Sequence, residues 1–254
     1  MPMMTEQQTV DALLGGRVRL HQPARGYRVA IDPVLLAAAS PARGSERVID
    51  LGAGTGAAAL CLAIRVPGAQ VVGVDADPFA LALAEAGARD SGVSGRVCFR
   101  QGDVARPLPT VLREAFDHAI ANPPYRPAGS GRSPADPGKA AATLEDAASL
   151  DAWARAAVSA VRPRGTVTVI HRADRLDALL AVLTGRLGQM TVFPLWPRRG
   201  RPARRVIVSG RKGSAAPIQL LPGLVLHGSD GRFTPEAEAV LRHMAPLSCA
   251  PVAA

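Results

Sequence analysis

Cysteine is scarce in this chain of 254 residues, and its spacing argues against two classes of small stabilised domain. The three cysteines, Cys61, Cys98 and Cys249, are odd in number and far apart in the sequence. Disulfide frameworks and zinc sites are typically built from paired, closely spaced cysteines. We therefore expect a protein with reduced thiols and no metal.

Long apolar runs are also missing. No stretch reaches the roughly 20 apolar residues that a membrane-spanning helix needs. The first residues, MPMMTEQQTV, lack the basic and apolar regions of a signal peptide. We expect a cytoplasmic protein with no membrane partner.

Acidic residues are fewer than basic ones. The chain has 21 Asp and Glu against 30 Lys and Arg, a formal net charge of +9. This excess favours a polyanionic partner such as nucleic acid. A genome-wide preference for Arg and Ala is the alternative explanation of the same charge.

Strand-like and helix-like segments alternate along most of the chain. Apolar, β-branched segments predict strands within residues 47–56, 70–77, 96–103, 116–125 and 165–171. Segments of helical composition separate most of them, and MTVFPLWP followed by RRGRPARRVIVSGRKG predicts two strands joined by a basic turn. This order favours the α/β class, with a mostly parallel, doubly wound sheet and a C-terminal antiparallel hairpin in one domain.

The regions outside this alternation carry weaker patterns. Residues 1 to about 16 are polar, and we expect no regular structure there. A helix should begin near Asp32, which could serve as its N-cap, because Pro33 suits the first helical position. The stretch from Arg126 to Thr143 is rich in Gly, Pro, Ala and Ser, which is typical of a binding loop or lid.

A glycine-rich turn, DLGAGTG, follows the first predicted strand. Gly52, Gly54 and Gly56 allow a sharp turn and a close approach of the backbone to a ligand. With Ala57 the turn also satisfies the dinucleotide fingerprint, and Asp75 lies at the distance expected for a residue that accepts hydrogen bonds from ribose hydroxyls. The turn alone does not choose between NAD and S-adenosylmethionine, and a turn without any ligand is a further alternative.

Two more carboxylates stand at predicted strand ends. We expect Asp103 to accept a hydrogen bond from the exocyclic amine of an adenine, and Asp50 to contact the ligand's amino group directly or through water. Each could instead be a helix cap or a turn former. Three carboxylates at adjacent strand ends, counting Asp75, make a ligand site the better interpretation.

The stretch NPPY ends another predicted strand, FDHAIA. Two prolines cannot continue a central strand, because each lacks the amide hydrogen. Asn122 and Pro123 would set two oxygen acceptors side by side, while Tyr125 offers a flat face for stacking. Two acceptors suit a planar NH2 group: they favour rehybridisation of its nitrogen and stabilise the positive charge that develops on it. An ordinary turn is the alternative.

These motifs together resemble a known family. DLGAGTG, VVGVDAD, the GD pair at residues 102–103 and NPPY resemble the ordered motifs of class I S-adenosylmethionine-dependent amino-methyltransferases, which act on adenine N6, guanine N2 or glutamine N5. GGRVRLHQPARGYRVAIDPVLLAAA and LPGLVLHGSDGRFTPEAEAVLR resemble, more narrowly, the bacterial tRNA1(Val) adenine-N6-methyltransferase family.

The resemblance implies a seven-stranded Rossmann-like sheet, S-adenosylmethionine held by the glycine turn and Asp75, and methylation of an adenine beside a tRNA anticodon. Asn122 would belong to the cofactor site as well as to the catalytic one. Residues 1–45 would cover the cofactor, with Tyr27 to Asp32 over its methionine end, followed by a core over 46–212 and an extension over 213–254. The loop after NPPY has few basic residues, so the family's substrate contacts are not carried over to it.

The basic turn and its flanking strands are the predicted RNA contact. They carry Arg198, Arg199, Arg201, Arg204 and Arg205, followed by Arg211 and Lys212. Phosphate contacts of such residues position an RNA without reading its sequence. The alternative is a solvated sheet edge whose charges prevent pairing with another chain.

Other functions stay open at this point. Glutamine N5 methylation shares NPPY, although no separate helical recognition domain precedes the glycine turn, and guanine N2 of ribosomal RNA is a further acceptor. An RNA-binding module without catalysis would not need Asn122 and Tyr125. An NAD-dependent oxidoreductase would need an acid or base for hydride transfer, but His118 fits a packed strand residue better, and His171 is only a weak candidate for a substrate contact.

Overall fold

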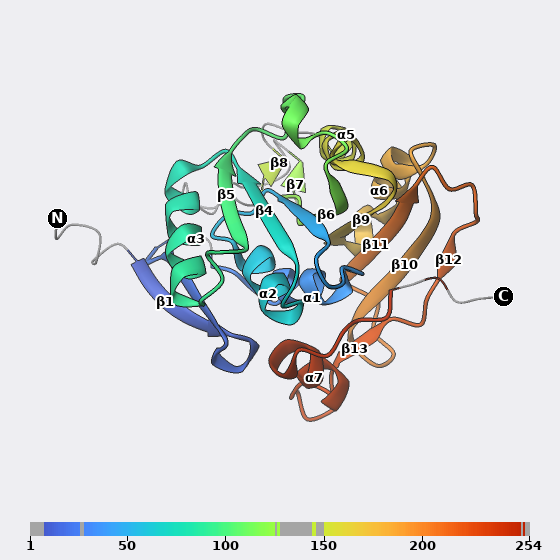
Figure 1. Cartoon of the computed structure of the whole chain (residues 1–254). Helices are drawn as coiled ribbons and strands as arrows, with labels where there is room; N and C mark the ends of the chain where they lie inside the picture. The colour runs from blue at the N-terminus through green and yellow to red at the C-terminus, as the bar shows by residue number, and fades with distance from the viewer. Residues whose placement is uncertain are drawn as a thin grey trace.

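The computed structural model describes residues 8–25, 28–124, 126–127, 144–145, 150–249 and 251. Within them a nine-stranded sheet forms the centre of the molecule (Figure 1). Across the sheet its strands are β5 (Val97–Gln101), β4 (Gln70–Asp75), β3 (Arg47–Leu51), β6 (Phe116–Ala121), β9 (Val161–Arg172), β11 (Arg205–Lys212) and β10 (Leu187–Arg198), followed by β12 (Gln219–Leu220) and β13 (Leu224–His227), which both pair with β10. The strands from β5 to β9 are parallel, and β11 is antiparallel to both of its neighbours.

This arrangement confirms the predicted fold class and hairpin, but the strand number of seven is wrong for the described chain. The two additional strands come from the C-terminal residues. β12 pairs with β10 at Thr191 and Val192, and β13 pairs with it from Leu195 onward. Both cover the outer edge of β10, whose backbone groups would otherwise have no strand beside them.

Helices cover both faces of the sheet. α1 (Asp32–Ala39), α2 (Ala57–Arg65) and α3 (Pro78–Asp90) lie on one face with α7 (Pro235–His243), while α5 (Leu150–Ala160) and α6 (Leu176–Leu183) lie on the other. The short elements are η2 (Leu14–Gly16), η3 (Thr110–Leu112), η4 (Ala173–Arg175) and the paired strands β7 (Arg126–Pro127) and β8 (Leu144–Glu145). None of the helices in these described ranges is long and apolar enough to cross a membrane.

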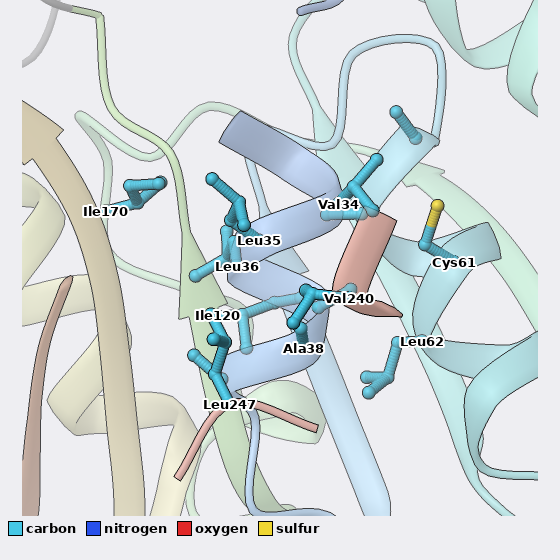
Figure 2. Close-up of a cluster of buried hydrophobic side chains, with 14 of the residues drawn as sticks. Val34, Leu35, Leu36, Ala38, Cys61, Leu62, Ile120, Ile170, Val240 and Leu247 are labelled. Atoms are coloured by element: carbon cyan, nitrogen blue, oxygen red, sulfur yellow. The ribbon is translucent and has the colours of Figure 1, made fainter. Parts of the chain in front are cut away.

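Helix α1 is buried along its whole length. Figure 2 shows its apolar side chains between the sheet residues Ile120 and Ile170, the α2 residue Leu62 and the α7 residue Val240. All eight residues of α1 are buried, including Asp32 at its start. Because neighbours enclose the helix, the position of Asp32 at the sheet edge is fixed by packing.

The expectation of no regular structure before residue 16 is wrong from residue 8 onward. β1 (Gln8–Leu13) pairs antiparallel with β2 (Val18–Pro23) along its full length. Gly15 and Gly16 reverse the chain between them with φ angles of +65° and +92°, which glycine adopts without strain. β2 packs on α3 and buries Val18 and Leu20, so tertiary contacts stabilise a hairpin whose first strand is too polar to predict.

Gly223 provides a test of how the C-terminal strands are fitted against β10. Its φ is +82°, and an added Cβ would lie 2.1 Å from the Pro194 carbonyl oxygen. Gly223→Ala should therefore suffer both backbone strain and a clash with a strand. Gly200 is the matched control, since its φ is +73° but a Cβ there would meet nothing within 4 Å.

We expect Gly200→Ala to lower the free energy of unfolding by about 1 kcal/mol, the cost of a left-handed Ala. Gly223→Ala should lose about 2 kcal/mol more, because backbone atoms must shift to relieve the clash. Urea denaturation of the two variants and the wild type measures the difference. Equal losses would show that β13 is not held as closely to β10 as described.

Candidate active site

The carboxyl ends of β3 and β6 lie side by side where the strand order of the sheet reverses. From β3 the chain moves outward through β4 and β5, then returns to β6 on the other side of β3. Leu51, the last residue of β3, pairs with Ala121, the last residue of β6. In open α/β sheets, ligands bind in the crevice at such a reversal. The fold therefore brings together the glycine turn and Asn122, which are about 70 positions apart in sequence.

The three glycines of the turn are required for different reasons, although all have positive φ, at 68°, 53° and 82°. A Cβ on Gly52 would lie 2.3 Å from the Trp153 ring, and one on Gly56 would lie 2.7 Å from the Phe99 ring. A Cβ on Gly54 would meet nothing within 4 Å. Two glycines thus permit packing, while Gly54 leaves open space in which a ligand could approach the backbone.

Asp75 shapes this turn from the end of the neighbouring strand. Its Oδ2 accepts a hydrogen bond from the Gly54 amide at 2.7 Å, and its Oδ1 accepts one from the Asp77 amide at 3.0 Å. A carboxylate has about four acceptor positions, so these two bonds leave capacity for further donors. Asp75 therefore holds Gly54 and keeps acceptor capacity for the ribose hydroxyls expected from the sequence, a role that stays a prediction.

Asp50 lies beneath the turn and is 2% exposed. Its Oδ2 accepts a hydrogen bond from the Ala59 amide, in the first turn of α2, at 3.1 Å. Burial, with a smaller contribution from the charge of Asp75, raises the pKa of the Asp50 carboxyl to about 8. A carboxyl in this state holds α2 against β3, and its predicted contact with a ligand amino group stays a prediction.

Asp103 follows β5, at the same edge of the sheet. Its Oδ1 accepts a hydrogen bond from the Ala105 amide at 2.8 Å, which is the turn-forming role weighed as the alternative. The Arg106 side chain lies 3.7 Å from its other oxygen. Because Asp103 is only half-buried, the turn leaves part of the carboxylate accessible.

Asn122 directly follows β6 and is partly exposed, whereas Pro123 is buried. β6 ends at Ala121, as the two prolines require. Tyr125 and Tyr27, expected over the substrate and the cofactor, lie outside the described residues. The acceptor roles of Asn122 and Pro123 stay predictions that their position at the strand reversal supports.

The two histidines on the central strands occupy opposite ends of the sheet. His118 is packed as expected: its ring bonds the Thr166 hydroxyl at 2.6 Å and the Glu46 carboxylate at 2.9 Å, near the amino end of β6. His171 stands at the carboxyl end of β9 and is 1% exposed. Its burial argues against a direct contact with substrate.

The basic turn lies at the same edge as the candidate site. Arg205 at the start of β11 pairs with Arg172 at the end of β9, so residues 199–204 extend beyond the carboxyl ends of the parallel strands. Arg198, Arg199, Arg201 and Arg204 are exposed there. Arg211 and Lys212, grouped with them in the sequence, lie at the opposite edge, because β11 runs antiparallel to β9.

Arg205 differs from the other arginines of the turn. Its Nε donates to the Oδ2 of Asp32 at 2.8 Å, and its guanidinium also donates to the Arg204 carbonyl. The prediction of Asp32 as N-cap is therefore wrong: the helix begins at Asp32 itself, Ile31 is the capping residue, and the carboxylate is directed to Arg205. This ion pair joins the start of α1 to the basic hairpin.

Sequence reasoning missed the Asp32–Arg205 pair, Thr55 and the role of Trp153. Trp153 is buried, and its ring closes one side of the glycine turn. The Trp153 indole nitrogen and the Thr55 hydroxyl are buried without a hydrogen-bond partner among the described residues. Only Thr55 could have been found from the sequence, because it lies inside the glycine motif. Trp153 lies about 100 residues away from that motif in the sequence.

Comparisons with known proteins agree with this geometry. The model of a methyltransferase domain matches residues 43–184. A tRNA1(Val) (adenine(37)-N6)-methyltransferase of Porphyromonas gingivalis is 30% identical over 227 residues, 85% of this chain and 88% of the relative. A release factor glutamine methyltransferase of Gloeobacter violaceus is 44% identical over 81 residues, 32% of this chain and 27% of the relative. The crystal structure of a predicted O-methyltransferase from Agrobacterium tumefaciens has a TM-score of 0.72 at 24% identity and covers 87% of this chain and 100% of its own, a likeness of fold.

The strand order, the glycine turn and the domain match define a class I, S-adenosylmethionine-dependent methyltransferase. Similarity over most of the chain makes it a member of the bacterial tRNA1(Val) (adenine-N6)-methyltransferase family. The family, the enzyme class and the cofactor S-adenosylmethionine, all expected from the motifs, are thereby confirmed. The oxidoreductase alternative is excluded.

The residues at the strand reversal fit this cofactor. Gly54 leaves space for it, Asp75 retains acceptor positions for its ribose hydroxyls, and the buried Thr55 hydroxyl lacks a partner among the described residues. The cofactor supplies an electrophilic methyl group on a sulfonium. Asp50 is buried at the end of β3, just before the turn, and its contact with the cofactor stays a prediction.

Asp75→Ala should weaken S-adenosylmethionine binding because it removes the acceptor for the ribose hydroxyls and releases the Gly54 amide. Hydrogen bonds to a charged group contribute about 1.5–3 kcal/mol, so we expect roughly a 10- to 150-fold loss of affinity. Isothermal calorimetry with S-adenosylmethionine measures it. Asp90→Ala is the control, since that carboxylate bonds His21 at the far end of α3. Unchanged affinity in Asp75→Ala, or tight binding of NAD by the wild type, would contradict the assignment.

Proposed function

We propose that this enzyme transfers the methyl group of S-adenosylmethionine to the N6 amine of an adenine in tRNA. The observation that carries the proposal is the position of Asn122 and Pro123 at the end of β6, directly beside the glycine turn at the strand reversal. The length of the match to the tRNA1(Val) (adenine(37)-N6)-methyltransferase of Porphyromonas gingivalis supports tRNA as the substrate. A cytoplasmic location follows as part of the same proposal.

The chemistry follows from two fixed acceptors. The Asn122 side-chain oxygen and the Pro123 carbonyl each accept a hydrogen bond from one N–H group of the adenine amine. These two hydrogen bonds favour a pyramidal nitrogen, direct its lone pair at the methyl group and stabilise the positive charge that forms. The methylated nitrogen is then acidic enough to lose a proton without a strong base. Tyr125, outside the described residues, is proposed to stack on the adenine after the base is flipped out of the RNA.

The basic turn is the proposed contact for the body of the RNA. Arg198, Arg199, Arg201 and Arg204 are exposed at the edge that carries the candidate site. Arg205 was predicted as a fifth contact, and its bond to Asp32 makes it better suited to hold the turn in place than to bind phosphate alone. An RNA bound at this edge would have its target adenine within reach of Asn122.

Two other acceptors compete with adenine N6. The glutamine methyltransferase of Gloeobacter violaceus matches only about a third of this chain, so the likeness extends to a shared core and not to the whole protein. Guanine N2 has the same two N–H donors. Mass spectrometry of tRNA and ribosomal RNA nucleosides, and of release factor peptides, from a strain lacking the gene would identify the methyl mark that disappears. Loss of N6-methyladenosine from tRNA supports the proposal, and loss of a different mark overturns it.

Asn122→Ala should separate cofactor binding from chemistry. Removing one preorganised partner of a transition state typically costs about 10²–10³-fold in rate. We expect a loss of this size in single-turnover methylation of tRNA, while calorimetry should show nearly normal S-adenosylmethionine binding. Near-normal transfer by this variant would count against the mechanism.

The exposed arginines predict a salt-dependent affinity. Each phosphate contact releases counterions, so replacing Arg198, Arg199 and Arg201 by Ala should weaken tRNA binding regardless of sequence and reduce the slope of log affinity against log salt by about one unit per lost contact. Salt titrations of tRNA binding test this. Replacing Arg162, Arg164 and Arg211 removes the same charge from the opposite edge of the sheet and serves as the control. Equal slopes in both triple variants would assign the basic turn to a solvated edge.

A further inference from the structure

Arg172 is the last residue of β9, the strand beside β6. Since Ala121 at the end of β6 pairs with Val169, Arg172 stands three residues farther toward the same edge. Neighbouring strands lie about 4.8 Å apart and rise about 3.3 Å per residue, so its Cα is roughly 8 Å from that of Asn122 along the line of β6. The register therefore places an arginine close to the acceptor site without putting it beside the acceptors themselves.

The side chain of Arg172 lies on the face of the sheet that α1 covers. Ile170, two residues earlier, packs with α1 on this face, and so does Ile120, two residues before Asn122 (Figure 2). Because side chains alternate between the two faces of a strand, Arg172 follows Ile170 onto this face. Its cross-strand neighbour Arg205 also points there, since it bonds the first residue of α1. Asn122, Arg172 and Arg205 thus lie at the same end of three neighbouring strands.

Asp174 holds the guanidinium of Arg172. The Arg172 Nε donates to the Oδ1 of Asp174 at 2.8 Å, and its Nη2 donates to the Oδ2. A bidentate pair of this kind fixes geometry, although an ion pair between partly exposed side chains contributes little to stability. A guanidinium has five N–H donors, and the Nη1 of Arg172 donates to no residue in the described part of the chain. Arg172 therefore keeps donors for an anionic ligand while its orientation is set.

The pairing of Arg172 with Arg205 is unfavourable by itself. Like charges directly opposite each other on neighbouring strands destabilise a sheet. Each arginine has a carboxylate partner, Asp174 or Asp32, which offsets this repulsion. Stability therefore does not explain two cations at this position, and departures from local preference of this kind are typical of functional sites.

We propose that Arg172 binds a backbone phosphate next to the adenine that is methylated. The inference rests on the proposed transfer to an adenine of tRNA. Sugar and base separate the phosphate of a nucleotide from its exocyclic amine, so a phosphate contact belongs several ångströms from Asn122, where Arg172 stands. A planar guanidinium matches the geometry of phosphate, and the contact holds the flipped nucleotide in place while the basic turn binds the rest of the RNA.

The first test compares Arg172→Ala with Arg162→Ala. The control removes an arginine of the same strand that is also paired with an aspartate, Asp117, but at the opposite edge of the sheet. We expect Arg172→Ala to lower kcat/KM for tRNA about 10- to 100-fold, mainly through KM, because it loses charge-assisted hydrogen bonds made before and during transfer. Arg162→Ala should stay near the wild type, and calorimetry should show normal S-adenosylmethionine affinity for both. Arg172→Lys should recover only part of the loss, since lysine lacks the bidentate fork.

Asp174→Ala separates orientation from charge. It removes a negative charge from the edge proposed to bind RNA, so long-range attraction alone would raise the affinity for tRNA. Loss of the partner that orients Arg172 should instead lower kcat/KM. An increase in kcat/KM would show that only net charge matters at this position and would overturn the inference.

Neutralising a single phosphate identifies the contact. The nucleoside analysis first locates the target adenine, and tRNA is then assembled with a methylphosphonate on its 5′ or 3′ side. One of the two substitutions should slow the wild type and barely affect Arg172→Ala, because each change removes the same contact.

The outcomes separate this contact from the proposed function. If the wild type methylates tRNA but Arg172→Ala behaves like Arg162→Ala, the contact is wrong and the proposed function stands. The same conclusion follows if the methylphosphonates slow Arg172→Ala as much as the wild type. If the wild type transfers no methyl group to tRNA and methylates a release factor glutamine instead, the proposed function itself fails, and the phosphate contact fails with it.

Discussion

The pairing of β3 with both β4 and β6 is the constraint on which the rest of the site depends. Each parallel strand contributes the loop at its carboxyl end, so the order β4, β3, β6, β9 determines which loops become neighbours. The glycine turn is bordered by Asp75 on one side and by Asn122 on the other for this reason alone. With the cofactor on the turn and the acceptor beside Asn122, as proposed, both would be held on rigid strands, which transfer between two bound groups requires.

The two ends of the chain add to this arrangement through α1. The helix is enclosed by the sheet, α2 and α7, and its first residue is a buried carboxylate bonded to Arg205 of the hairpin. A buried ion pair contributes less to stability than its distance suggests, because both groups lose hydration. Here the pair joins the start of α1 to the base of the basic turn, and so links the proposed cofactor cover to the proposed RNA contact.

Much of the core could be predicted from the sequence because the signals are local. Apolar strands ending in glycines, carboxylates or prolines predict the succession of the parallel strands along the chain and place Asp75 and Asn122 at strand ends. What could not be predicted depends on contacts between distant residues. β12 is two residues long and exists because β10 offers an edge, and β1 is polar but pairs with a buried strand. Likewise, no local pattern indicates that Trp153 packs on Gly52, or that Asp32 bonds Arg205 across the sheet edge.

The basic residues also show that composition alone does not predict where in the fold a residue lies. The net charge of +9 suggested a polyanionic partner, and the hairpin appeared to present one continuous basic stretch. The fold divides that stretch, since antiparallel strands send Arg198 and Arg199 to the candidate site and Arg211 to the opposite edge. Lys212 donates to Glu114 and the Val161 carbonyl, and Arg205 bonds Asp32, so both are engaged within the protein. The proposed RNA surface therefore consists of the arginines that remain exposed beside the strand reversal, and the net charge of the chain exceeds the charge of that surface.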